Sequence, residues 1–355
     1  MIDDIILAIE INDPAKVNKK DFRIKGSDSY KTVFIQNNEK GSKEFKPSLS
    51  YSQFAGNKPS VLTIKGSIAK WYNDGKNNLK EPQKSDLPSL VEKMIIDLER
   101  MGVNLTPEDI LNAKPLRVDF SKNIILSLGS TFPAVVKRVS YSMLPRFKNT
   151  TKGFKNGGTQ YTVDTDSVGV SLYDKKREMG EDFKSFVIPD MYPSQDILRI
   201  EIRLNSYRAI KCKLARAGIK KDNYTFQDLF DEDVSKKVIN YFWNDIISNI
   251  PPIYELSNAT DTYNSVEITP HLKDRLAYAQ LTQMMSENRS EELKILLECH
   301  YSKKNTYNFL KGYEKHCSIN AVIKPSDVLD DITKQLDEFV LITDVIDISD
   351  ISKDK

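Results

Sequence analysis

Residues 197–204 read Ile-Leu-Arg-Ile-Glu-Ile-Arg-Leu, and this stretch decides the expected fold. Apolar residues alternate with Arg199, Glu201 and Arg203, which is the period-two pattern of a β-strand with one apolar and one polar face. Residues 115–125 (PLRVDFSKNII) alternate in the same way, with Arg117 and Asp119 on the polar side. Two such strands predict a sheet that buries one face under helices and keeps charged groups on the other.

Further strands and helices surround this pair. Strands are expected at 4–11, 31–36 and 60–64, and a hairpin at 159–163 and 168–173. Helices are expected at 90–101, from Thr106-Pro107 onward, at 234–246, and at 270–287, 290–301, 305–316 and 326–340. The stretch 132–143 fits either a helix or a strand. The sequence therefore predicts an α+β protein with an antiparallel sheet, helices packed on one side and an α-helical C-terminal region.

Length and composition set the broad class. The chain has 355 residues, of which 39% are hydrophobic and 29% charged, a balance that excludes a disordered or collagen-like protein. We expect two domains, residues 1–250 and 251–355, with the boundary at Pro251-Pro252. No run of 18 apolar residues is present, so no membrane span is expected. The acidic N-terminus and three scattered cysteines predict a reducing, cytoplasmic setting.

Charge is unevenly distributed along the chain. Between residues 120 and 163 the basic side chains have no acidic residue among them; they are Lys122, Lys137, Arg138, Arg146, Lys148, Lys152 and Lys155. Such a stretch can line a phosphate-binding surface, and a solvated basic loop is the alternative. The last 32 residues, by contrast, carry four lysines and nine acids, a net charge of −5.

Asp119, Asp174 and Glu201 each lie between basic residues on a predicted strand. Adjacent strands would bring such carboxylates together on one face, where they repel unless a cation neutralises them. Arg or Lys side chains can do so, and so can Mg²⁺ or Mn²⁺, which prefer oxygen ligands. Cross-strand salt bridges on a solvated face are the alternative interpretation.

Tyr161 follows Gly157-Gly158-Thr159-Gln160 on the basic stretch. A tyrosine beside a divalent cation and basic groups can attack a phosphodiester and become a phosphotyrosine; an ordinary strand tyrosine is the alternative. A catalytic metal held by histidines is not expected, because the chain has only three histidines. Cys299-His300 and His316-Cys317 could bind Zn²⁺, or simply belong to paired amphipathic helices.

The order of several segments resembles the replication initiators of the filamentous-phage gene II/X type and the related initiators of rolling-circle plasmids. The matching segments are Leu62-Thr-Ile-Lys-Gly-Ser-Ile-Ala-Lys70 with Asn73-Asp-Gly-Lys-Asn77, then Leu116-Arg-Val-Asp-Phe120, Thr159-Gln-Tyr161, Val170-Ser-Leu-Tyr-Asp-Lys-Lys-Arg-Glu178 and Leu198-Arg-Ile-Glu-Ile-Arg-Leu204.

The resemblance implies an origin-specific nickase that cuts one DNA strand, keeps the 5′ phosphate on a tyrosine and later rejoins the strand. By position, Asp119 and Glu201 would be ligands of Mg²⁺ or Mn²⁺, with Asp174 and Glu178 as weaker candidates. Lys175 would stabilise the phosphate or the leaving oxygen. Tyr161 is the first candidate nucleophile and Tyr173 the second.

The implied partners are origin DNA, double-stranded and single-stranded, and a host helicase, in the cytoplasm of a bacterial host. Beside the basic stretch, the arginines that flank the two carboxylates, Arg117, Arg199 and Arg203, join the expected DNA-binding set. Two rival functions stay open at this point: a non-enzymatic, sequence-specific DNA-binding protein, and a structural or partner-binding protein. The sequence leaves the replicon and the oligomeric state open.

Overall fold

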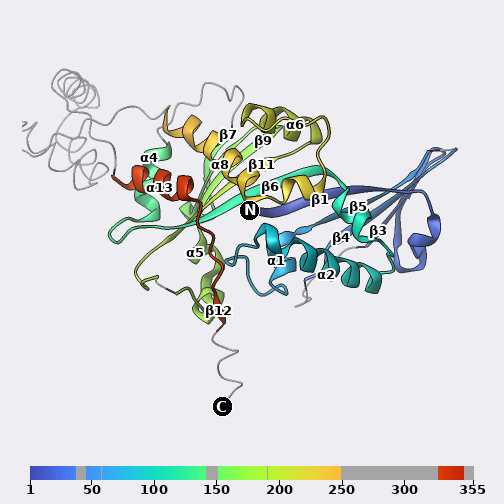
Figure 1. Ribbon diagram of the computed structural model, residues 1–355, viewed down its shortest axis with the longest axis horizontal. Helices are drawn as coiled ribbons and strands as arrows, with labels where there is room; N and C mark the ends of the chain where they lie inside the picture. The colour runs from blue at the N-terminus through green and yellow to red at the C-terminus, as the bar shows by residue number, and fades with distance from the viewer. Residues whose placement is uncertain (37–44, 57, 141–150, 190, 249–326, 348–355) are drawn as a thin grey trace, which may run out of the picture. The chain divides into compact units, whose positions relative to one another are not determined.

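The computed structural model describes residues 1–36, 45–56, 58–140, 151–189, 191–248 and 327–347. Ten strands form one antiparallel sheet in the order β2-β3-β4-β5-β1-β6-β11-β9-β8-β7 (Figure 1). Their bounds are β1 Ile2–Ile11, β2 Arg23–Ser27, β3 Lys31–Gln36, β4 Ser48–Phe54, β5 Ser60–Ser67, β6 Lys114–Ile125, β7 Thr151–Lys155, β8 Gln160–Asp164, β9 Val168–Asp174 and β11 Ile197–Leu204. The sheet and its helices confirm the predicted α+β class.

The two faces of the sheet differ in chemistry, as the alternation predicts. β6 and β11 pair so that Arg203 lies opposite Asp119 and Glu201 opposite Ser121. Residues paired directly across strands share a face, so these four side chains lie on one side, which we call the polar face. The opposite, apolar face carries Phe120 and Ile202, both 0% exposed.

Two helices pack on β6 and β11. They are α6 (Tyr207–Arg216) and α8 (Glu232–Ile247), and both contact these two central strands. α8 buries Val238, Phe242 and Ile246, a helical stripe that suits the apolar face. Burial of this stripe removes the apolar face from water and leaves the polar face for chemistry.

The remaining helices of the sheet domain are short apart from α2. They are α1 Ile68–Tyr72, α2 Leu87–Arg100, α3 Pro107–Leu111, α4 Phe132–Ser140, α5 Lys175–Met179 and α7 Phe226–Leu229, with 3₁₀ turns at Pro14–Lys16, Lys19–Asp21, Lys84–Asp86, Asn156–Gly158 and Gly180–Ser185. Thr106 and Asp109 form a reciprocal capping box at the start of α3. The ambiguous stretch 132–143 is helical over Phe132–Ser140.

The C-terminal segment returns to the sheet domain. α13 (Asp327–Glu338) places Gln335 Nε2 3.0 Å from the carbonyl oxygen of Ile125, and β12 (Ile346–Asp347) pairs with β10 (Phe186–Val187). The chain divides into two compact units, Met1–Asn249 with Asp331–Lys355, and Ile250–Asp330. The C-terminal stretch therefore belongs to the same compact unit as the sheet.

Several expectations fall outside the described residues. These are the helices at 270–287, 290–301 and 305–316 and the pairs Cys299-His300 and His316-Cys317. Helix α13 agrees with the expected helix at 326–340. Over the ranges that the structure describes, none of the helices combines the length and the apolar character that crossing a bilayer requires.

Candidate active site

Polar side chains form three rows across the polar face. The strand pairing aligns Gln160–Tyr173–Arg199–Asn123 in the first row, Thr162–Ser171–Glu201–Ser121 in the second, and Asp164–Gly169–Arg203–Asp119 in the third. Most of these side chains are buried although they are polar. Buried polar groups need hydrogen-bond partners, and hydrogen bonds join the row members of β6 and β11 across the strands, whereas the buried Thr162 Oγ1 has no partner in the described structure.

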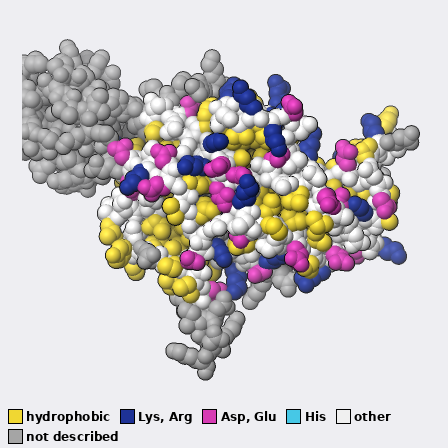
Figure 2. Space-filling view, viewed as in Figure 1, with side chains coloured by type: hydrophobic (Ala, Val, Ile, Leu, Met, Phe, Trp, Pro, Cys, Tyr) yellow, Lys and Arg dark blue, Asp and Glu magenta, His cyan; other side chains and the backbone are white. Residues whose placement is uncertain are grey.

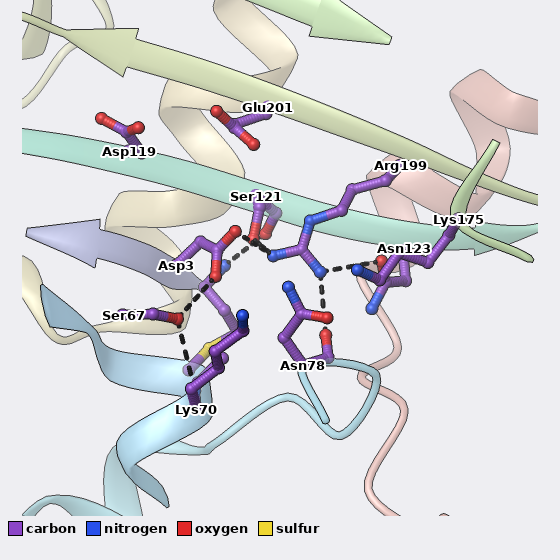
Figure 3. A network of polar contacts seen from close by, with 12 residues as sticks. Asp3, Ser67, Lys70, Asn78, Asp119, Ser121, Asn123, Lys175, Arg199 and Glu201 are labelled. Carbon is purple, nitrogen blue, oxygen red and sulfur yellow. Dashed lines mark hydrogen bonds and ion pairs between the residues drawn. The ribbon is translucent and has the colours of Figure 1, made fainter. Parts of the chain in front are cut away.

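Arg199 is the centre of this network (Figure 3). Its guanidinium lies 2.5 Å from Asp3 Oδ2, and the residue is 1% exposed. It also donates to Ser121 Oγ at 3.0 Å, to Asn123 Oδ1 at 3.2 Å and to the carbonyl of Asn78 at 2.8 Å. A buried charge is tolerated when paired and hydrogen-bonded in this way. Arg199 therefore organises the site from within, and the expectation that it presents its charge to DNA is not met.

Asp3 links β1 and α1 to this centre. Ser67, the N-cap of α1, donates from Oγ to Asp3 Oδ1 at 3.1 Å and accepts from the backbone N–H of Lys70. In Figure 3 the Lys70 side chain extends from α1 toward Asp3. Burial alone would raise the pKa of Asp3, but the charges of Arg199 and Lys175 hold that pKa below its ordinary value. Asp3 is therefore the ionised counter-charge of the network.

The loop that precedes α2 closes the network on one side of β6. The backbone N–H of Asn123 donates to Glu81, and the side-chain amide of Asn123 donates to the carbonyl of Leu79. Glu81 also forms a buried ion pair with Lys122 at 2.6 Å. Because Lys122 is 2% exposed, this member of the basic stretch is structural. The loop thereby fixes the Asn78 carbonyl against Arg199.

Asp119 and Glu201 lie close together because one arginine bridges them. Arg203 donates from Nε to Asp119 Oδ2 at 3.0 Å and from Nη2 to Glu201 Oε1 at 2.9 Å. Arg117 adds two bonds to Asp119, at 3.0 and 2.6 Å. The structure thus brings the two expected metal ligands together, and in the arrangement described here they form the cross-strand salt bridges of the alternative interpretation.

The donor set suits a hard divalent cation in its chemistry. Nowhere in the described ranges are three or more His, Cys, Asp or Glu side chains grouped as a ready-made metal cage. Mg²⁺, however, keeps several waters and typically uses one or two carboxylates together with substrate phosphates. Burial and then the neighbouring Asp3 raise the pKa of Glu201. Asp119 and Glu201, which Arg203 now bridges, are the two carboxylates that could hold such an ion.

Asp4 belongs to the same cluster of carboxylates, since burial and then the charges of Asp3 and Asp119 raise its pKa to about 6. The folded protein therefore holds a proton on Asp4 at pH 5 that the unfolded chain does not, and the wild-type protein loses stability as pH rises from 4 to 6. We expect Asp4→Asn to raise the free energy of unfolding at pH 7 by about 1–2 kcal/mol, half the full value of the shift because the side chain is partly solvated. Urea denaturation measures the difference, which should vanish near pH 3.5; an equal effect at both pH values would contradict this account.

Tyr173 presents its hydroxyl to the carboxylates. The hydroxyl donates to Glu201 Oε2 at 3.3 Å, and the ammonium of Lys175 lies 5.8 Å from the centre of the tyrosine ring. Burial raises the pKa of Tyr173 well above its ordinary value, although the charge of Arg199 opposes that rise. Tyr173 is therefore protonated without DNA, and a cation brought by the substrate complex would favour its ionisation.

Lys175 is fully buried at the start of α5 and pairs with Glu178. Burial, and then the charge of Arg199, lower the pKa of Lys175 to about 8. Glu178 is half exposed and engaged by this lysine. A lysine with such a pKa carries its charge at neutral pH and loses it in mildly alkaline solution.

Tyr161 and Asp174 lie on the other face of the sheet. Tyr161 pairs with Leu172, and Asp174 with Leu198, so both share the side of the apolar residues. Tyr161 is 3% exposed, and Asp174 caps α5 by accepting from the backbone N–H of Arg177 at 3.1 Å. The expectation that Tyr161 lies beside the carboxylates is therefore not met: the β8–β9 pairing puts Tyr161 opposite Leu172, whereas the β9–β11 pairing puts Tyr173 next to Arg199 on the polar face.

The expected DNA-binding residues are scattered. Arg138 lies on α4 and Lys155 at the end of β7, where Lys155 pairs with Asp164 at 3.0 Å. Arg146 and Lys148 fall outside the described residues, and the side chains of Lys137 and Lys152 do too. Arg117 and Arg203 are partly exposed but bound to the carboxylates.

The site residues that sequence reasoning missed lie on several segments of the chain. Asp3, Asp4, Ser67, Asn78, Ser121 and Asn123 all join the site. Ser67 lies within a segment that carries the resemblance, but the resemblance assigns it no role. The signal for Asp3 is a charged residue at the start of an otherwise apolar strand.

The comparisons with known proteins decide the family. Residues 1–222 match the family described as the N-terminal part of the gene II replication-associated protein. The chain belongs to this family of gene II-type replication initiators. No curated protein and no solved structure matches the chain.

The family match extends from β1 through α6, so it includes every residue of the candidate site described above and ends before α8. The family initiates replication by the rolling-circle route, and such an initiator binds origin DNA. The polar face of the central strands is thus within the matched part of the chain, and the C-terminal region lies outside the match.

Proposed function

We propose that this protein is an origin-specific, metal-dependent DNA nickase that cuts and rejoins one strand through a 5′-phosphotyrosine on Tyr173. The observation that carries the proposal is the hydroxyl of Tyr173 on Glu201, within a buried polar network that contains Lys175 and Arg199. The nucleophile, a proton acceptor and a cation lie together there, and the chain belongs to a replication-initiator family.

The residues of this chain have separate parts in the proposed reaction. Glu201 accepts the proton as Tyr173 Oη attacks the scissile phosphorus, the bond to the 3′ oxygen breaks, and that oxygen takes a proton from water to leave as the 3′ hydroxyl. In this proposal the charge of Lys175 balances the phosphate once its pair with Glu178 opens, and Arg199 holds Asp3 and the strand positions around it. Asp119 and Glu201 would hold a divalent cation, which when bound polarises the scissile phosphate. Rejoining reverses these steps.

A plasmid assay tests the proposal. Supercoiled DNA carrying the replicon's origin is incubated with the full chain and Mn²⁺. Nicked circles with protein covalently attached to the 5′ end are the expected result, and Glu201→Gln should give none. A gel shift without cleavage would support the rival, non-enzymatic DNA-binding function, which the arginine-paired carboxylates of the present arrangement would suit.

The pKa of Lys175 gives nicking a pH limit. Because that pKa is lowered to about 8, the ammonium is charged below this pH and neutral above it. We expect the nicking rate to fall above pH 8, by roughly tenfold for each further unit. Lys175→Arg keeps its charge at these pH values, so its alkaline fall should move up by more than about one unit. Identical pH profiles for the two proteins would contradict a role for the charge of Lys175.

A further inference from the structure

The polar face continues beyond the candidate site onto β2–β5. Ile35 pairs with Ser50, Ser50 with Thr63, and Thr63 with Ala8 of β1, so one side runs unbroken across these strands. The side chains of Ser50 and Thr63 are partly exposed, whereas Tyr51 and Leu62, on the other side of the same strands, are 0% exposed. The apolar side is therefore covered here and the polar side faces solvent.

This solvent-facing side carries cations and hydroxyl groups, with the apolar Val33 and Val61 among them, and the exposed acid Glu10 lies on the same side near the end of β1. We call it the open face and define it by Arg23, Lys31, Ser48, Ser50, Thr63 and Lys65, which the pairing places on the side of Ile35. The acid closest to it in the turn between β2 and β3, Asp28, accepts from the backbone N–H groups of Tyr30 and Lys31, both at 2.7 Å. Lys and Arg side chains together with Ser and Thr hydroxyls are groups that commonly contact DNA phosphates.

Protection of a sheet edge does not explain this pattern. Charged side chains on an edge strand prevent pairing with other chains, and Arg23 of β2 could serve that purpose. Lys65, however, lies on β5, three strands in from the edge. Lys65 is exposed in the middle of the sheet face and next to hydroxyl groups. This position indicates that the face binds a ligand.

We propose that the open face holds the sugar-phosphate backbone of duplex DNA next to the nick site. The proposal rests on the proposed function and extends it to a second contact region. β2 is four strands from β1, which is about 19 Å at the usual strand spacing. That distance corresponds to roughly six base pairs of B-form DNA. Figure 1 shows β3, β4 and β5 extending away from β6, and Figure 2 shows Lys and Arg side chains interspersed with Asp and Glu at that end.

Duplex DNA fits this surface better than a single strand does. Proteins that bind single strands rely on exposed aromatic rings on which bases stack. On the open face, the ring of Phe54 pairs with Lys31, whose ammonium lies 5.3 Å from the ring centre. The flat array of short hydroxyl side chains and cations offers phosphate contacts without base contacts, so binding should depend little on sequence.

A matched pair of charge variants tests the proposal. The open-face variant is Arg23→Gln/Lys31→Gln/Lys65→Gln in the full chain. The control, Lys211→Gln/Arg216→Gln/Lys220→Gln, removes the same charge from exposed positions on and just after α6, which packs over the apolar face. Fluorescence anisotropy measures binding of a duplex of about 30 base pairs and of a single strand of equal length and mixed sequence, between about 50 and 200 mM NaCl.

We expect the open-face variant to bind the duplex about tenfold or more weakly at low salt, with a salt slope flatter by about 2.7, or 0.9 for each lost phosphate contact. The single strand should bind the open-face variant with the affinity that it has for the wild-type protein. The control variant should bind both DNAs with wild-type affinity. Equal losses of duplex affinity in both variants would mean that net charge alone governs binding. A loss of affinity limited to the single strand would mean that the open face binds single-stranded DNA. Either result overturns the proposal. Nicking of single-stranded replicon DNA separates the two ideas, because failure of nicking in the wild-type protein removes the proposed function but leaves this binding result intact.

Discussion

Tyr173→Phe is expected to abolish the covalent protein–DNA adduct and to reduce nicking by at least about 10³-fold, because it removes the attacking oxygen. Phenylalanine keeps the ring, and only the bond from the hydroxyl to Glu201 is lost. The fold and DNA affinity should therefore survive, which circular dichroism and anisotropy can check.

The matched control is Tyr161→Phe. Tyr161 lies one strand away, but its position opposite Leu172 puts it on the apolar face, so we expect this variant to retain the adduct and a nicking rate within about twofold of wild type. Peptide mapping of the adduct after nuclease digestion identifies the modified residue. A phosphorylated peptide that contains Tyr161 would contradict the assignment and restore the choice that the sequence suggested.

The two tyrosines show where sequence reasoning reached its limit. Both lie on strands that the sequence predicts. Which of them faces the carboxylates depends on two registers: β9 against β11 puts Tyr173 on the polar face, and β8 against β9 puts Tyr161 on the other face. A shift of one residue in the β8–β9 register would bring Tyr161 to the polar face as well. The turn at 165–167 sets the β8–β9 register, and its geometry is not evident from the residue types.

The central strands were predictable because their alternation is strong and local. β6 and β11 follow the expected ranges, and the shared face of Asp119 and Glu201 follows from that alternation. β4 reads SLSYSQF, in which serines replace the usual β-branched residues, so propensity gave no signal. Its pattern makes sense only in the sheet, where the serines at 48 and 50 line the open face and Leu49 and Tyr51 are buried.

The buried part of the site was not predictable because it depends on contacts distant in sequence. Arg199 meets Asp3 from the other end of the domain and the carbonyl of Asn78 from a loop. A backbone carbonyl carries no signature in a sequence. The charged residues of the central strands were evident, but which carboxylate would neutralise which arginine was decided by the strand order β1-β6-β11.

Breaking the Asp3–Arg199 pair should have the largest effect on stability. The pair lies 2.5 Å apart, with both side chains at most 10% exposed. Asp3→Asn removes the counter-charge and leaves the guanidinium buried, which we expect to lower the free energy of unfolding by about 3–5 kcal/mol. Urea denaturation at pH 7 measures the loss. The exposed pair of Lys184 and Glu181 provides the control, because Glu181→Gln should leave stability unchanged within error.

The double variant separates charge pairing from packing. Arg199→Met alone leaves Asp3 buried without its partner, so it should also destabilise the protein strongly. In Asp3→Asn/Arg199→Met no unpaired charge remains, and the double variant should lose clearly less than the sum of the two single losses. Additive losses would mean that the hydrogen bonds to Ser121, Asn123 and Asn78, rather than the ion pair, hold the network. Because the same arginine lies beside Tyr173 and Glu201 in the strand rows, the double variant should fold and yet nick poorly, since the positive charge that opposes the raised pKa of Tyr173 is gone.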